Sequence, residues 1–217
     1  MLILRKEFFS FFSHAAGALL GLVGAAVLAA LSVNSGALLA VSLIYGISIT
    51  MLFVFSALYH AKKRSDNENS IWRRLDHFAI FIMIAGTYTP LAYIYLDGGW
   101  RWGIIIAQWS LVLLGLFFKL IFFRAPRYIS TAVYLVMGWM ALLVLGKIIS
   151  VMDAFSLGAL FAGGVFFTIG AVIYMIKKPN PLPERVGFHG VFHVFILLGG
   201  ISHFCVVADA LLKASVR

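Results

Sequence analysis

The stretch HGVFHVFILLGGISHF, residues 189–204, has no Lys, Arg, Asp or Glu and places three histidines among apolar side chains. It lies within a longer apolar run, Phe188–Leu212. As a helix rising 1.5 Å per residue, this run would cross a hydrocarbon core of about 30 Å. His189 and His193 are four residues apart, so their rings would project from one face of that helix. The stretch therefore predicts a membrane-spanning helix with two imidazoles side by side near its start.

The composition of the whole chain agrees with a membrane environment. Of its 217 residues, 63% are hydrophobic and 12% are charged, whereas soluble domains average about 45–50% apolar and about 25% charged residues. A water-soluble globule is excluded on this ground. Cys205 is the only cysteine, so no internal disulfide can form.

Seven apolar runs are each long enough to span a bilayer. They are Phe12–Val33, Ala37–His60, Leu75–Tyr95, Trp102–Phe123, Tyr128–Lys147, Ala154–Ile176 and Phe188–Leu212. The breaks between them contain charged residues, glycines and prolines, and are short. We predict an all-α integral membrane protein, a seven-transmembrane helix bundle that forms a single membrane domain over residues 1–217.

The basic residues predict the orientation of this bundle. Most of the Lys and Arg side chains fall in segments on the same side of the membrane as the N-terminus, and the positive-inside rule assigns that side to the cytoplasm. The formal net charge of +9 is then explained by loops that face the anionic lipids of the inner leaflet, and no nucleic acid partner is needed. The expected location is the cell membrane, as a multi-pass protein.

Ionisable residues gather where four of the predicted spans reach one membrane face. Such groups are costly within a bilayer, usually point into the bundle, and mark functional sites. The group comprises Glu7, His14, His60, Asp76, His77, His189 and His193, and the polar Ser56 lies among them.

Three imidazoles of this group, on His60, His189 and His193, suit a zinc ion with one open coordination position, as in catalytic zinc sites. Asp76 would hydrogen-bond a water on the metal or act as its base. Ser56 would bond to that water or to a substrate carbonyl; bonding to a carbonyl of its own helix is an equal alternative. A pair of interfacial histidines without metal is the alternative for residues 189 and 193. His203 would lie about 15 Å farther along the helix, so we expect it to be buried and hydrogen-bonded outside the site.

The set Ser56-x-x-x-His60, Asp76 and His189-x-x-x-His193 resembles the signature of the progestin and adipoQ receptor (PAQR) family. The segments IAGTYTP (Ile84–Pro90) and YLVMGW (Tyr134–Trp139) resemble its bacterial hemolysin III branch. Glu7 and His14 match the ends of that branch's opening pattern, with serines in place of its Asn and Thr. The resemblance implies a seven-helix bundle with a cytoplasmic N-terminus. It also implies a zinc ion held by the three histidines near the inner surface, with Asp76 and Ser56 beside it.

Three functions are compatible with these residues. The first is a zinc-dependent lipid hydrolase, cleaving an amide or ester as a ceramidase does and serving membrane lipid homeostasis. The second is a non-enzymatic receptor or homeostasis protein with a structural zinc. The third and weakest is a lytic pore, because a pore needs polar lining through the full bilayer depth. An open coordination position favours the hydrolase. The roles of Glu7, His14, His77 and His203, the lipid itself and the oligomeric state stay open at this level.

Overall fold

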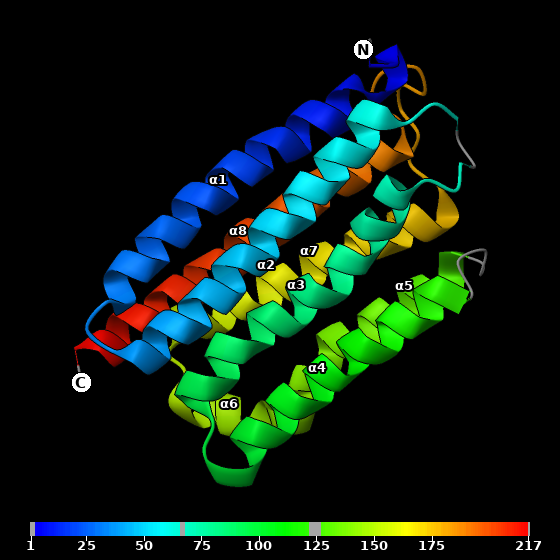
Figure 1. Ribbon diagram of the computed structural model, residues 1–217. Helices are drawn as coiled ribbons and strands as arrows, with labels where there is room; N and C mark the ends of the chain where they lie inside the picture. The colour runs from blue at the N-terminus through cyan, green and yellow to red at the C-terminus, as the bar shows by residue number, and fades with distance from the viewer. Residues whose placement is uncertain (1–2, 66–67, 122–126, 217) are drawn as a thin grey trace.

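The computed structural model describes residues 3–65, 68–121 and 127–216 and shows an elongated bundle of helices (Figure 1). Seven of the described helical segments are long and apolar enough to cross a membrane, as the sequence predicts. In chain order the elements are η1 (Arg5–Glu7), α1 (Phe8–Ser32), α2 (Gly36–Lys62), α3 (Ile71–Tyr95), α4 (Gly98–Ile121), α5 (Arg127–Gly138), η2 (Trp139–Val144), α6 (Leu145–Val151), α7 (Ala154–Ile176) and α8 (Phe188–Ser215).

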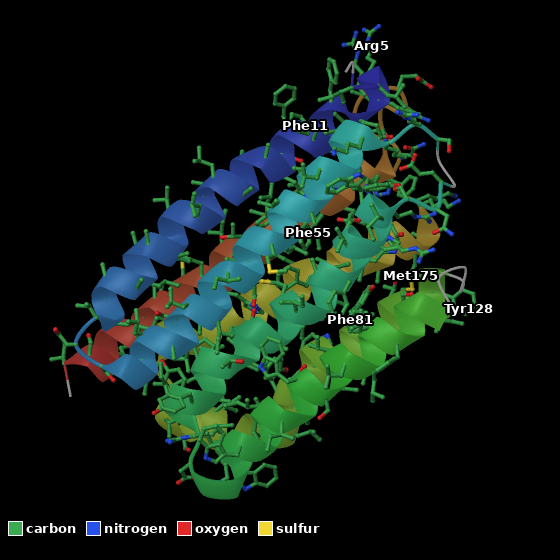
Figure 2. The ribbon with its side chains drawn as sticks, in the orientation of Figure 1. Arg5, Phe11, Phe55, Phe81, Tyr128 and Met175 are labelled. Carbon is green, nitrogen blue, oxygen red and sulfur yellow. The ribbon has the colours of Figure 1, made fainter. Side chains whose placement is uncertain are left out.

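Successive spans run in opposite directions, so the two ends of the bundle hold different sets of helix termini. One end, which we call the N-terminal end, holds the starts of α1, α3, α5 and α8 and the ends of α2, α4 and α7. Figure 2 shows Arg5, Tyr128 and Met175 toward this end, which runs from the top to the right of the view. The C-terminus lies at the opposite end (Figure 1).

Helix α8 occupies a central position, because it packs against α7, α1, α3 and α2. Glycines of α1 allow this helix to approach α2 and α8 closely. A Cβ atom on Gly17 would lie 2.8 Å from the Phe53 ring, and one on Gly24 would lie 2.7 Å from the Phe204 ring. Small residues at helix contacts are the usual means of close packing in membranes. The α1, α2 and α8 side of the bundle is therefore tightly packed.

The fifth span differs from its prediction as one continuous helix over Tyr128–Lys147. It extends to Val151 and changes to a 3₁₀ helix in its middle, at η2. Side chains of neighbouring helices satisfy its backbone there. The Tyr88 hydroxyl donates to the Gly138 carbonyl and accepts from the Ala141 N–H, both at 2.7 Å. Irregular backbone at membrane depth is tolerated where protein groups bond to it in this way.

Polar residues close the end of the bundle opposite to the N-terminal end. Asp153 caps α7 by accepting the N–H groups of Phe155 and Ser156, and Lys213 forms an ion pair with both Asp153 and Asp209. The hydrogen bond from Lys213, followed by that from the Ser156 N–H, lowers the pKa of Asp153 to about 2. Asp153 therefore stays ionised as a helix cap throughout the ordinary pH range.

Candidate metal centre

Three imidazoles converge at the N-terminal end of the bundle, as their sequence positions suggest. His60 comes from the last turns of α2, and His189 and His193 come from the first turns of α8. The Nε2 atom of His189 lies 3.2 Å from Nε2 of His60 and 3.1 Å from Nε2 of His193. One possible ligand atom from each of the three rings lies within 4.8 Å of those of the other two. His60 and His193 are each only 1% exposed.

This spacing fits a metal ion. With zinc–nitrogen bonds of about 2.0–2.1 Å, two ligands of a tetrahedral site lie about 3.3 Å apart, close to the two Nε2 separations above. Neutral nitrogen donors without a thiolate are a set that divalent zinc accepts. The three side chains could therefore hold a metal ion through their Nε2 atoms.

The hydrogen bonds on the other ring nitrogens determine which tautomers are present. Glu7 Oε2 lies 2.6 Å from His60 Nδ1, so this nitrogen carries the proton that the carboxylate accepts. The Ser13 hydroxyl donates to the Ser10 carbonyl at 3.1 Å and lies 3.4 Å from His193 Nδ1. Since that hydroxyl proton is already used, His193 Nδ1 donates to it. The Nε2 atoms of His60 and His193 are consequently unprotonated. Each carries the lone pair that a metal ligand needs.

Glu7 is the clearest site residue whose role the sequence did not reveal. Its carboxylate is buried, bonds to His60 through one oxygen and accepts from the Lys63 ammonium at 2.7 Å through the other. A carboxylate that bonds the outer nitrogen of a metal-ligating histidine fixes the ring and raises its basicity. The sequence placed Glu7 in the group of ionisable residues at one membrane face and in the opening pattern of the hemolysin III branch, but its contact with His60 was not predicted.

His14 also lies directly at the site. Its ring stacks on that of His193 with 3.6 Å between centroids and 12° between planes. His14 is 2% exposed. His14 and Ser13 both lie near the start of α1. This end of α1 therefore covers one side of His193.

The loop between α2 and α3 holds the end of α2 beside the start of α3. Glu68 accepts from the Arg64 N–H and the Ser70 hydroxyl, both at 2.8 Å. Partial burial would raise the pKa of Glu68, but these hydrogen bonds outweigh it and lower that pKa. Ser70 in turn caps α3 by accepting from the Arg73 N–H.

Asp76 lies in the second turn of α3 and within hydrogen-bonding reach of Ser56 on α2. Both residues line a cavity of about 310 Å³, together with His189 and His193. The two candidate catalytic residues and two of the three candidate ligands thus line one cavity. His77, the neighbour of Asp76, lines the same cavity.

The cavity continues from this polar end toward the middle of the bundle. His203 lines its far part, and its Nε2 lies 3.3 Å from the Leu160 carbonyl. His203 packs so closely on Gly163 that a Cβ there would lie 2.2 Å from its ring. His203 is thus held by α7 and is not among the three converging imidazoles, in agreement with the sequence prediction.

Comparison with known proteins agrees with this architecture. A family model described as "Haemolysin-III related" matches residues 2–204. The chain belongs to the haemolysin III-related family. It is 31% identical over 214 residues to "Hemolysin-3" of Bacillus cereus, covering 97% of this chain and 94% of the relative. It is 32% identical over 213 residues to "Hemolysin-3 homolog" of Bacillus subtilis (strain 168), covering 95% of each protein.

The membership confirms the resemblance drawn from Ser56, His60, Asp76, His189 and His193. The chain is a haemolysin III-type, multi-pass membrane protein with seven helices long enough to span the bilayer. Three buried or partly buried histidines in it could hold a metal ion.

Proposed function

We propose that this protein is a zinc-dependent hydrolase that cleaves an amide or ester bond of a membrane lipid and so serves membrane lipid homeostasis. One observation carries the proposal: two of the three candidate zinc ligands line a cavity that a carboxylate and a hydroxyl also line and that extends between apolar side chains. A structural metal needs no such space beside it.

Each residue of the chain has a distinct role in this proposal. His60, His189 and His193 hold the metal. When bound, zinc polarises the scissile carbonyl as a Lewis acid and lowers the pKa of a water molecule. Asp76, which shares the cavity with His189 and His193, accepts the proton of the attacking water. The Ser56 hydroxyl, within hydrogen-bonding reach of Asp76, donates to this carboxylate.

The apolar part of the cavity suits the hydrocarbon portion of the substrate. Below Asp76 the walls are formed by residues such as Leu52, Ile80, Met83 and Ile196. The cavity volume of about 310 Å³ lies at the lower end of the range for small-molecule sites, about 300–1,000 Å³. A lipid could place its polar linkage beside the histidines and its chain among these apolar groups.

A structural role for zinc is the second candidate, and the arrangement of the helices favours it to some degree. The candidate ligands come from α2 and α8, and Glu7 connects the start of α1 to His60. A metal there would join three helices whether or not a reaction occurs. A receptor or homeostasis protein would need no more. A lytic pore is less well supported, because the cavity walls beyond the polar end are mainly apolar.

We further propose that the N-terminal end of the bundle faces the cytoplasm. Lys62, Arg64, Arg74 and Lys177 are among the basic residues at this end. The positive-inside rule supports a cytoplasmic position for them, and anionic inner-leaflet lipids of the cell membrane would be their partners.

The substitution Asp76→Asn tests the proposed function. The amide keeps the shape of the side chain, so zinc should stay bound, at most about 10–100-fold more weakly. Turnover should fall about 100-fold or more, because the group that accepts the proton is gone. The assay measures zinc content beside the hydrolysis of ceramides, acylated lipids and lysolipids by protein in nanodiscs. Glu184→Gln, in the exposed loop before α8, is the matched control and should keep both properties.

The outcomes separate the two leading functions. A zinc-loaded Asn protein without turnover supports the hydrolase. The structural role would be favoured by two results together. The parent protein would hold zinc but hydrolyse none of these lipids, and the Asn form would fully restore membrane fluidity in cells that lack the parent protein. Parent protein purified without chelators and lacking zinc would contradict both.

A further inference from the structure

His14 differs from the other histidines around the candidate metal centre. It is buried, at 2% exposed, yet neither of its ring nitrogens has a hydrogen-bond partner within the part of the chain that the structure describes. His60 and His193 each have a protein partner on the ring nitrogen that points away from the site. A backbone group of His193 lies near the His14 ring, but neither ring nitrogen forms a hydrogen bond of ordinary geometry.

Such a residue is energetically unfavourable unless something outside the chain bonds to it. A neutral imidazole carries one N–H donor and one acceptor nitrogen, and a buried donor or acceptor without a partner costs about 1–3 kcal/mol. Phenylalanine would provide the same flat ring for stacking on His193 without this cost. Stacking alone thus explains the ring of His14 but not its nitrogens.

The position of His14 indicates where a partner would be. His14 lines the same cavity as Ser56 and Asp76, and it stacks on a candidate metal ligand. A molecule whose polar group reaches the metal centre would bring its oxygen or nitrogen atoms next to this ring. The mainly apolar walls farther in suit a hydrocarbon chain for the rest of the molecule.

We propose that His14 binds the lipid in the cavity by donating a hydrogen bond from a ring nitrogen to an oxygen of the acyl group. This inference rests on the proposed function, because it takes the cavity as the site of an acyl lipid. It assigns the recognition of the acyl oxygen to α1, a helix that supplies none of the three candidate metal ligands. The ligand class is a long-chain acyl compound with an accepting oxygen at its polar end.

The test uses a ligand that cannot be hydrolysed. Tetradecan-2-one, a long-chain ketone, has one accepting oxygen, and tetradecane has none. Both are added to full-length protein in nanodiscs of ether-linked lipids, which have no ester carbonyl of their own. Affinity is measured by titration, and the infrared carbonyl band of the bound ketone reports the hydrogen bond directly.

Three substitutions of His14 separate hydrogen bonding from stacking. His14→Phe keeps the stacked ring, while His14→Asn and His14→Gln keep an amide donor near the positions of Nδ1 and Nε2. We expect His14→Phe to bind the ketone about 2- to 12-fold more weakly, to shift its carbonyl band to higher wavenumber, and to bind tetradecane normally. Asn or Gln should restore part of both signals, and zinc content should not change.

Thr87→Val is the matched control in the same cavity. Thr87 lines the cavity, but its hydroxyl already donates to the Met83 carbonyl at 2.8 Å. It should therefore contribute nothing to ketone binding, and the Val protein should match the parent in affinity and carbonyl band.

Several outcomes would overturn the proposal. Normal ketone affinity in His14→Phe would mean that His14 contributes only stacking on His193. The same would follow if His14→Phe lost zinc without losing affinity for the ketone more than for tetradecane. If His14→Phe does not fold, the parent still decides, because a bound carbonyl band unshifted from its position in protein-free nanodiscs excludes the hydrogen bond. Failure of the proposed function is a separate result: the parent would lack zinc or turnover while ketone binding still depended on His14.

Discussion

Glu7→Gln tests whether the contact between Glu7 and His60 prepares the site for metal. The parent carboxylate lies 2.6 Å from His60 Nδ1 and 2.7 Å from the Lys63 ammonium. Glutamine can still accept the Nδ1 proton through its oxygen. Its NH₂ group would then face Lys63, so a donor would meet a donor. The variant thus exchanges a charge-assisted bond for a neutral one and loses the ion pair.

The magnitude follows from these two contacts. Charge-assisted hydrogen bonds are roughly twice as strong as neutral ones, and hydrogen bonds to charged groups contribute about 1.5–3 kcal/mol. Losing about half of the His60 bond costs about 0.8–1.5 kcal/mol, which corresponds to a zinc affinity about 3- to 12-fold lower at 1.4 kcal/mol per factor of ten. Glu7→Ala removes the acceptor entirely and should approach the 100-fold loss known for such supporting carboxylates.

The assay is competition for zinc between purified protein and a chromophoric chelator. Glu184→Gln serves as the control, because it removes the same charge from an exposed loop at the same end of the bundle. Zinc affinity of Glu7→Gln equal to that of the parent would refute the reasoning. It would mean that the orientation of His60 is determined by packing within α2 and not by the carboxylate.

Two further predictions concern the histidines of α8. His193→Ala should lose bound zinc and with it the zinc-dependent stabilisation, about 4 kcal/mol when free zinc exceeds the dissociation constant 1,000-fold, whereas His203→Ala should keep both. Metal analysis and thermal unfolding with and without zinc check this prediction, and equal metal loss in the two variants would mean that the site is misplaced. Gly163→Ala should lower stability by about 1–3 kcal/mol, because its Cβ would lie 2.2 Å from the His203 ring. Gly158→Ala, with open space around its Cβ, should unfold like the parent, and a Gly163→Ala protein as stable as Gly158→Ala would contradict the close packing.

The spans were predictable because hydropathy and charged breaks determine where a helix can cross a bilayer. Ala154–Ile176 has the same limits in the sequence prediction and in the structure, and α2 differs from its prediction by only a few residues at the ends. The break in the fifth span was not predictable. It depends on Tyr88 and Gln108, which come from other spans and bond to Gly138 and Met137 in place of helical backbone groups. Hydropathy contains no information on such contacts.

The candidate site was predictable to the level of helix ends. Spacing places His189 and His193 on one face, and the count of spans brings His60 to the same membrane side. The choice of Nε2 as the converging atom depends on Glu7 and Ser13, which bond to the outer nitrogens. Glu7 is 53 positions from His60 in the chain, so only the packing of α1 on α2 reveals that pair.

The bundle separates the part that needs fixed geometry from the part that needs space. Metal ligation tolerates displacements of only about 0.5 Å, and the candidate ligands come from α2 and α8, which both pack on α1. Phe53 of α2, for example, lies against both Gly17 and Gly200. The opposite wall of the cavity includes residues of the fifth span, such as Leu135, next to the point where Tyr88 replaces a helical hydrogen bond. Side chains from other helices bond to the backbone N–H and C=O groups of this wall. Its backbone can therefore depart from a regular helix without leaving polar groups unpaired. The irregular fifth span thus forms part of the cavity wall, while the glycine-packed helices hold the histidines in place.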